Sequence, residues 1–388
     1  MGYSREILWE KGEEKNGEID RNAILDSILQ GPLGDLAEKV LAGYRLDRAD
    51  GIRLGESGDL LTVGFLADYA RRRKVGDEVY FINNVHLNHT NICRNLCLFC
   101  AFGRTADAPG AYTLTLEEIA AKMEQARAYH PVEVHIVGGL NPALPFTYYE
   151  EMLTVVRKIL PEAHIQAFDA VEIAFLSEIS GLGIEDVLLR LRETGLGSLP
   201  GGGAEIFNPA VRRLICPRKI SGEHWLEVHR CAHRLGFHTN ATMLYGHIES
   251  IADRVDHLLR LRELQDETGG FLAFIPLPFH PENTAFSHLS RTSGYDDLKT
   301  FALARLLLDN FFAIKAFWIM LTPKLAQITL SFGANDLDGT VREERIAHDA
   351  GADTPQYQPA ETFLAMIREA GRIPVERDTL YNAIRRYD

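Results

Sequence analysis

The sequence predicts an α/β protein built on a (β/α) barrel, either full or partial. Three observations support this. Short apolar segments alternate with amphipathic segments of helical period between residues 79 and 341. One apolar segment, residues 271–275 (FLAFI), has no polar side chain, as expected for a parallel strand buried on both faces. Glycine-rich or polar loops follow several of the strands, where (β/α) barrels carry their chemistry. A doubly wound open sheet is the alternative architecture.

Residues 1–75 are expected to form a helical segment that packs on the barrel. Ile24, Leu25, Ile28 and Leu29 share one helical face, which indicates a helix near the start of this segment. A second helix is expected over residues 57–73. It ends in basic residues, which complement the negative end of the helix dipole.

Residues 76–341 are expected to form the barrel core, and residues 342–388 a polar C-terminal extension. Strands are predicted at 79–85, 132–137, 164–168, 198–199, 238–244, 271–275 and 314–321. Helices are predicted between them at 116–129, 148–159, 171–180, 184–193, 225–235, 251–267, 298–310 and 326–330. A polar loop over 333–340 closes the series, and the extension is predicted to contain helices at 361–370 and 377–386. Seven or eight strand–helix units fit one barrel domain.

Charge and composition exclude several classes of protein. The 388 residues include 41 Lys and Arg against 54 Asp and Glu, a net charge of −13, so we expect neither nucleic acid nor an anionic membrane as a partner. There is no apolar run of about 18 residues, so no membrane span is expected. The first 20 residues lack the apolar core of a signal peptide. These features, and clustered cysteines that suggest metal rather than disulfides, predict a cytoplasmic protein.

The cysteines cluster in residues 91–102 (NICRNLCLFCAF), directly after the first predicted strand. Cys93, Cys97 and Cys100 form a C-x3-C-x2-C run. Three thiolates at this spacing can hold three corners of a [4Fe–4S] cluster and leave the fourth iron open to a small chelating molecule. Such an iron can also pass that molecule one electron.

The cysteines have two other interpretations, a zinc site and a ferredoxin-like electron carrier. Zinc requires four ligands, and either His86 or His89 would have to supply the fourth. A ferredoxin-like carrier usually has four cysteines and a much shorter chain. The distant Cys216 and Cys231 are expected to be buried free thiols.

Further candidate residues lie in loops after the predicted strands. Gly138 and Gly139 follow one strand, and Gln166, Asp169 and Glu172 follow the next. A glycine pair can also be a plain turn, and Asp169 can simply cap the following helix.

Three residues in later loops are candidate catalytic groups. Glu205 follows the Gly201-Gly202-Gly203 run and could accept a proton or hold a hydroxyl, unless it is only a helix-start carboxylate. His280 in FHPENT is a possible acid, base or carboxylate partner, with a structural histidine as the alternative. Asp336 lies in GANDLDGT, either in a tight turn or against a substrate.

The cysteine spacing, with the aromatic Phe99 before the third cysteine, resembles the radical S-adenosylmethionine (SAM) superfamily. In that superfamily the amino and carboxylate groups of SAM fill the fourth iron site. Gly138 and Gly139 resemble its GGE motif, although Leu140 replaces the glutamate, so only the glycines transfer. The resemblance implies a SAM site formed by Phe99, Gly138, Gly139, Gln166, Asp169 and Glu172.

Within the superfamily, several segments resemble the aminofutalosine synthases of the futalosine route to menaquinone. They are LPGGGAEIF, RRLICPRKIS, TNATMLYGHIES, FIPLPFHPENT and GANDLDGT, and the resemblance is dense over residues 80–340. The related cyclic dehypoxanthinylfutalosine synthases and the enzymes that make the deazaflavin chromophore share the cysteine loop, the GGGAE segment and the GAND loop. The cyclases typically carry Gln and Gly in place of His280 and Glu282, which favours the synthase.

The resemblance also implies a reaction. The 5′-deoxyadenosyl radical from SAM adds to the enol ether of 3-[(1-carboxyvinyl)oxy]benzoate, the aryl group migrates, and carboxylate is lost. The product is 6-amino-6-deoxyfutalosine, so SAM is a co-substrate. An electron donor such as flavodoxin or ferredoxin is implied as a partner. Candidate partners for the substrate carboxylates, by position alone, are Arg212, Arg213, His280 and Arg291.

Overall fold

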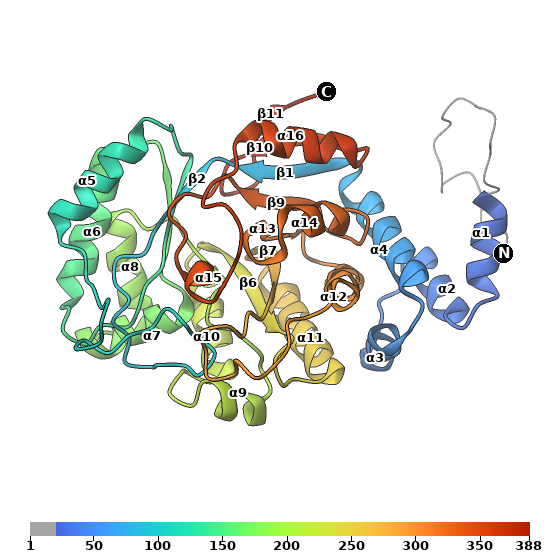
Figure 1. The fold of residues 1–388 in the computed structure, drawn as a ribbon, viewed down its shortest axis with the longest axis horizontal. Coiled ribbons are helices and arrows are strands. Elements are labelled where there is room, and N and C mark those ends of the chain that lie inside the picture. The colour runs from blue at the N-terminus through green and yellow to red at the C-terminus, as the bar shows by residue number, and fades with distance from the viewer. Residues whose placement is uncertain (1–20) are drawn as a thin grey trace.

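A computed structural model of the chain describes residues 21–388. Its main feature is a curled sheet of seven parallel strands in chain order, a partial barrel (Figure 1). The strands are β2 (Asn84–Leu87), β3 (Glu133–Ile136), β4 (His164–Ala167), β5 (Ser198–Leu199), β6 (His238–Tyr245), β7 (Phe271–Pro278) and β8 (Ala313–Ile314). Because the strand order never reverses, the predicted barrel is confirmed in its partial form and the doubly wound alternative is wrong.

Helices cover the outside of the curled sheet (Figure 1). They are α5 (Leu116–Arg127), α6 (Phe146–Ile159), α7 (Ala170–Ser180), α8 (Ile184–Thr194), α10 (Gly222–Arg234), α11 (Ile251–Thr268) and α12 (Gly294–Leu307). Local signals start several of them. Thr115 and Ser250 form capping boxes at α5 and α11, which satisfy backbone N–H groups that the helix leaves unpaired.

The N-terminal helices are α1 (Arg21–Leu29), α2 (Gly34–Ala42), α3 (Arg48–Glu56) and α4 (Leu60–Val75). Residues 1–20 of the predicted N-terminal segment lie outside the described residues. Helix α3 lies in the stretch expected to be helical but was not predicted as a separate helix, although Asp47 begins it with a capping box. Its Gly51 and Gly55 let it approach α11 and α12 closely, because a Cβ at Gly55 would lie 2.4 Å from the Ile251 side chain.

A second sheet joins strands from both ends of the chain in the order β11-β10-β1-β9. These are β1 (Glu78–Ile82), β9 (Asp336–Gly339), β10 (Ile373–Arg377) and β11 (Ala383–Arg386). The predicted helix at 377–386 is therefore wrong. Asp378 and Asn382 make a turn instead, in which the Asn382 amide donates to the Asp378 carboxylate at 2.8 Å.

Two strand predictions also need correction. The predicted strand at 79–85 divides at Asn83, so that β1 enters the small sheet and β2 the large one. The predicted strand at 314–321 ends at Ile314 and is followed by the short helix α13 (Trp318–Leu321). Asn84 explains the division, because its side chain accepts from the Val341 amide at 3.0 Å, a contact 257 residues away in sequence.

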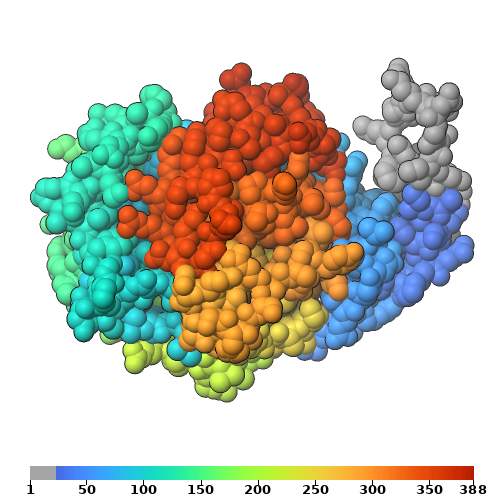
Figure 2. Space-filling model, viewed as in Figure 1, coloured from blue at the N-terminus to red at the C-terminus, as the bar shows by residue number. Residues whose placement is uncertain are grey.

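Strand β9 and the residues after it occupy the seam between the first and last strands of the large sheet. The Ala316 amide, after β8, donates to the Asp336 carbonyl at 2.7 Å. The His86 amide, in β2, donates to the Arg342 carbonyl at 3.0 Å. The chain after β9 then crosses the front of the molecule, and Figures 1 and 2 show it in dark orange and red.

The remaining helices are α9 (Pro209–Ile215), α14 (Pro323–Thr329), α15 (Ile346–Asp349) and α16 (Ala360–Glu369). None of the helices within residues 21–388 is long and apolar enough to cross a membrane.

Candidate active site

A cavity of about 330 Å³ lies at the carboxyl ends of the large sheet's strands. Every residue predicted to hold the cluster, to bind SAM or to act in catalysis lines it, except Asp336. The fold therefore brings together loops that are far apart in the sequence. This is the end of a barrel at which parallel strands deliver side chains to a common site.

The cysteine loop is held in place by backbone hydrogen bonds on several sides. The Cys93 amide donates to the Arg104 carbonyl at 2.9 Å, and the Arg94 amide donates to the Leu140 carbonyl at 3.0 Å. Cys93, Cys97 and Cys100 are all free thiols that line the cavity. Burial raises the pKa of Cys97 to about 12, against the opposing effect of Lys219. Without a bound cation this group is a thiol, and a cation bound to it would favour the thiolate.

The three thiols suit a cluster better than a single ion. Nowhere in residues 21–388 do three His, Cys, Asp or Glu side chains converge closely enough to hold one metal ion. His89, weighed as a fourth zinc ligand, is fully buried outside the cavity lining, with its ring 5.6 Å from that of Tyr149. Burial lowers the pKa of His89 to about 4. A cubane cluster instead takes thiolates spread around its corners.

Gly138 and Gly139 place bare backbone directly beside the cysteine loop. A Cβ at Gly139 would lie 2.3 Å from the Ile92 carbonyl oxygen, and one at Gly138 would lie 2.4 Å from the His89 ring. Neither position has room for a side chain. The same is true of Gly201, where a Cβ would lie 2.7 Å from the backbone of Ala241. These glycines are required for the close approach of the loops around the cavity.

Asp169 and Glu172 form a capping box at the start of α7, as the alternative interpretation of Asp169 predicted. Asp169 accepts from the Val171 and Glu172 amides at 2.8 and 2.9 Å. Glu172 accepts from the Asp169 amide at 2.9 Å and from the Gly138 amide at 3.1 Å. Burial raises the pKa of both carboxyl groups. Glu172 thus ties the loop after β3 to the loop after β4.

A buried ion pair that sequence reasoning missed lies beside the thiols. Lys219 Nζ is 2.5 Å from Glu205 Oε1 and 5.2 Å from the centre of the Phe99 ring. Burial opposes the charge of Lys219, but Glu205 and the neighbouring thiols raise its pKa well above the usual range. The segment RRLICPRKIS contains this lysine, but nothing local distinguishes it from a surface lysine.

The other end of the cavity is polar and contains a second cation. Lys315 Nζ lies 3.2 Å from Asp338, and the rings of His86 and His135 stack with centres 4.7 Å apart. Burial lowers the pKa of both histidines, so both are neutral at pH 7. His135 Nδ1 lies 3.2 Å from Gln166 Oε1, which places the predicted Gln166 in this network.

Three buried polar atoms of the lining have no hydrogen-bond partner among residues 21–388. They are Oδ1 of Asn88, Oδ1 of Asn240 and Nδ1 of His280. The other ring nitrogen of His280 lies 2.9 Å from the Met320 carbonyl oxygen. Buried polar groups are costly to leave unpaired, so these atoms mark positions where a ligand would bind.

Asp336 is the predicted catalytic residue that the structure places elsewhere. It lies in the small sheet, where Arg377 and the Tyr381 hydroxyl both donate to it at 2.7 Å. Asp338, and not Asp336, lines the cavity. Residues two apart in a strand normally share a face, but Asp338 has a φ of +65°, which breaks the alternation.

The arginines predicted as carboxylate partners also lie outside the cavity lining. Arg212 is buried and donates to backbone carbonyls, including that of Ile220 at 2.5 Å. Arg213 is exposed on α9, and Arg291 pairs with Glu282 at 2.7 Å. Of the four candidates only His280 lines the cavity.

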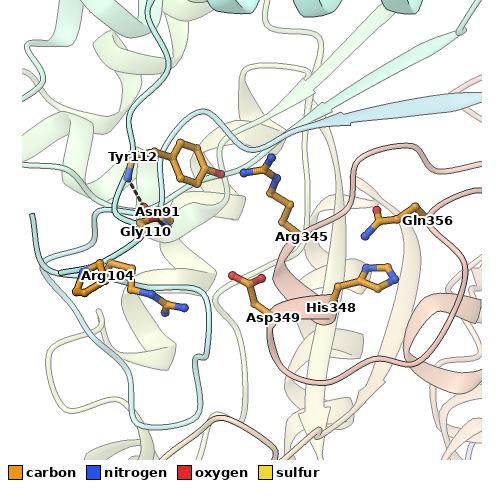
Figure 3. A pocket seen from close by; sticks show the side chains of 9 residues that line it. Asn91, Arg104, Gly110, Tyr112, Arg345, His348, Asp349 and Gln356 are labelled. Carbon is orange, nitrogen blue, oxygen red and sulfur yellow. Dashed lines mark hydrogen bonds between the residues drawn. The ribbon is translucent and has the colours of Figure 1, made fainter.

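A second cavity lies on the other side of α15 (Figure 3). Ile346, Ala347 and Ala350 line the active-site cavity, whereas Arg345 and Asp349 line the second one. Figure 3 shows these two side chains opposite Tyr112 and Arg104 of the segment that follows the cysteine loop. Residues 344–350 therefore form a wall between the two cavities.

Comparison with known proteins defines the class of this site. Residues 87–261 match the radical SAM superfamily, and residues 268–387 match the CofH/MqnC C-terminal region. The fold is that of methylornithine synthase, with a TM-score of 0.69 and 20% sequence identity over 87% of this chain and 97% of that one. The protein is therefore a radical SAM enzyme, and the [4Fe–4S] cluster and SAM are the cofactors of its family.

Full-length relatives define the family more narrowly. The chain is 46% identical to the aminodeoxyfutalosine synthase of Thermus thermophilus over 91% of this chain and 96% of that protein. It is 43% identical to the 5-amino-6-(D-ribitylamino)uracil–L-tyrosine 4-hydroxyphenyl transferase of Methanopyrus kandleri over 83% of this chain and 88% of that protein. The chain belongs to the aminodeoxyfutalosine synthase family, which confirms the resemblance seen in its motifs.

Proposed function

We propose that the protein is an aminodeoxyfutalosine synthase. It joins the 5′-deoxyadenosyl group of SAM to 3-[(1-carboxyvinyl)oxy]benzoate, with aryl migration and loss of the carboxylate, to give 6-amino-6-deoxyfutalosine for menaquinone biosynthesis. The observation that carries the proposal is the similarity to a relative of that name over nearly its full length. The cavity supports it, because three thiols and two lysine cations, Lys219 and Lys315, line the same space.

Cys93, Cys97 and Cys100 are proposed as the cluster ligands, since all three are free and face one cavity. When bound, the cluster and SAM supply the one-electron chemistry that releases a carbon radical. The protein positions that radical and isolates it. The backbone at Gly138 and Gly139 approaches the cysteine loop closely enough to contact a ligand bound there.

Lys219 is proposed to bind the carboxylate of SAM. It is the cation of the cavity lining that lies beside the cysteine loop, 5.2 Å from the Phe99 ring. Glu205 fixes its position through a short ion pair. Charged hydrogen bonds of this kind are shorter and stronger than neutral ones, which suits the orientation of a reactive group. Glu205 is thus proposed as a positioning residue rather than a proton acceptor.

Lys315 is proposed to bind a carboxylate of the enol ether at the far end of the cavity. Its ion pair with Asp338 leaves ammonium hydrogens free, and Asn240 and His280 offer unpartnered polar atoms in the same lining. Part of the cavity wall is apolar, formed by Leu244, Ile275, Leu277, Phe279, Phe317 and Met320. An apolar wall excludes water, which would otherwise weaken these charged contacts.

The similarity to 4-hydroxyphenyl transferases supports a second candidate, and the cyclic dehypoxanthinylfutalosine synthases remain a third. Product analysis separates them. The reconstituted protein is incubated anaerobically with SAM, dithionite and one substrate of each enzyme in turn. A covalent deoxyadenosyl adduct formed from 3-[(1-carboxyvinyl)oxy]benzoate supports the proposal. Turnover confined to tyrosine with the ribitylaminouracil, or to dehypoxanthinylfutalosine with release of free 5′-deoxyadenosine, refutes it.

The free thiols also bear on location. Cluster assembly requires reduced cysteines, and a reducing cytoplasm maintains them. We propose that the enzyme works there, with flavodoxin or ferredoxin as its electron donor.

A further inference from the structure

An exposed patch with apolar and basic side chains lies on the outer side of the cysteine loop. It comprises Arg94, Leu98, Arg213, Leu214 and Arg218, and is called here the thiol-loop patch. The two leucines are 44% and 60% exposed, which is high for large apolar side chains. Their segments are neighbours, because the Leu98 amide bonds to Ile215, the residue after Leu214. Exposed apolar side chains that gather in one patch mark an interaction site more often than isolated ones do.

Two hydrogen bonds connect this patch to the thiols. The Leu98 amide donates to the Ile215 carbonyl at 2.9 Å, which seats the end of α9 against the cysteine loop (Figure 1). The Arg218 guanidinium donates to the Arg94 carbonyl at 3.2 Å, next to Cys93 in sequence. Leu98 itself follows Cys97 directly. Arg94 and Leu98 of the patch thus lie in the segment that carries the thiols, and the other three residues lie in a segment bonded to it.

The charge of the patch is opposite to that of the whole chain. The protein carries a net charge of −13, which repels acidic partners in general. Arg94 is paired with Glu178. Within residues 21–388, however, Arg213 and Arg218 form no ion pair with a carboxylate at 4.0 Å or less. Two unpaired guanidinium groups beside exposed leucines form a local positive site on an acidic surface.

We propose that the thiol-loop patch is the docking site for a small acidic electron-carrier protein. One electron passes from the prosthetic group of the reduced carrier to the oxidised cluster, so the carrier is oxidised by one electron and the cluster is reduced by one. An apolar centre with a charged rim is typical of protein interfaces, and complementary charge mainly speeds and orients such encounters. The site rests on the radical SAM chemistry of the proposed function, which needs an outside reductant.

The test measures binding of a purified bacterial flavodoxin, an acidic carrier. The variant Arg213→Glu/Arg218→Glu is compared with Arg234→Glu/Arg368→Glu, which changes two exposed arginines elsewhere and gives the same net charge. Leu214→Ser tests the apolar centre without a charge change. We expect the patch variant to raise the dissociation constant about tenfold at low ionic strength, with a smaller difference at high salt. The matched control should bind as the wild type does.

A second readout separates docking from catalysis. Flavodoxin-dependent reduction of the cluster, followed by its loss of colour, should slow in the patch variant, whereas turnover with dithionite should be unchanged. Equal binding by all variants, or an equal loss in the matched control, overturns the docking site. If dithionite gives no adduct with any variant while binding still depends on the patch, the proposed reaction fails and the docking site stands.

Discussion

Replacing Lys219 with methionine should destabilise the protein and weaken SAM binding for separate reasons. The Lys219 and Glu205 side chains are 12% and 9% exposed, so the variant leaves a carboxylate unpaired in a nearly buried site. Removing one partner of a buried ion pair costs about 3–5 kcal/mol. In a protein of this size that corresponds to a fall in Tm of several degrees.

The double variant Lys219→Met/Glu205→Gln separates the two effects. It removes both charges, so no carboxylate is left unpaired. Most of the stability lost in the single variant should therefore return, because replacing a buried ion pair by neutral groups of similar shape changes the free energy of unfolding little. SAM binding should stay weak, since the cation that faces the methionine carboxylate is absent. Losing one charged hydrogen bond costs about 1.5–3 kcal/mol of binding free energy, which raises the Kd for SAM about 10- to 150-fold.

The assay combines thermal unfolding with calorimetric titration of SAM into the anaerobically reconstituted protein. An unchanged Tm in the single variant would contradict the buried ion pair. Recovery of wild-type SAM affinity in the double variant would show that Lys219 is not a SAM ligand. Iron content is measured in each variant, because a lost cluster would by itself abolish SAM binding.

Three further outcomes are expected. Gly139→Ala should lower both Tm and iron content, because the clash of the new Cβ with the backbone costs about 1–3 kcal/mol. The control Gly58→Ala should lower neither, since its Cβ would meet no atom within 4 Å. Burial lowers the pKa of His89 to about 4, against 6.5 for a histidine in the unfolded chain. As the pH drops from 6.5 to 4, only the unfolded chain takes up this proton, so the free energy of unfolding falls. His89→Met should remove about 3 kcal/mol of that decline, seen as a flatter plot of Tm against pH. Asp336→Asn should cost about 3–5 kcal/mol by unpairing the buried Arg377, and Asp338→Asn should cost a similar amount by unpairing Lys315. Only Asp338→Asn should also raise the KM for the enol ether, because Asp338 would no longer position Lys315.

The barrel could be predicted because its signals are local. Each strand and each capped helix lies within a short window, so period and spacing reveal them. The small sheet could not be predicted, since Tyr80 in β1 pairs with Asp336 and Val375, far along the chain. Residues 377–386 therefore resembled a helix, although their conformation depends on a buried aspartate in another strand.

Some residues of the candidate site could likewise be predicted from local sequence, and others could not. Cys93, Cys97 and Cys100 are recognisable from their spacing, and Gly138 and Gly139 from their place after a strand. Lys219 is not, because its role depends on Glu205 and Phe99, which only the folded chain brings beside it. Asp336 and Asp338 look equivalent in the sequence, and a single positive φ decides which of them faces the cavity.

The most direct test of the proposed function follows the fate of labelled SAM. The wild-type protein, reconstituted anaerobically, is given SAM labelled with ¹³C in the ribose, together with dithionite and 3-[(1-carboxyvinyl)oxy]benzoate. If SAM is a co-substrate, mass spectrometry will find the label in 6-amino-6-deoxyfutalosine, and the Cys97→Ala protein will form none. Label found only in free 5′-deoxyadenosine would contradict the account.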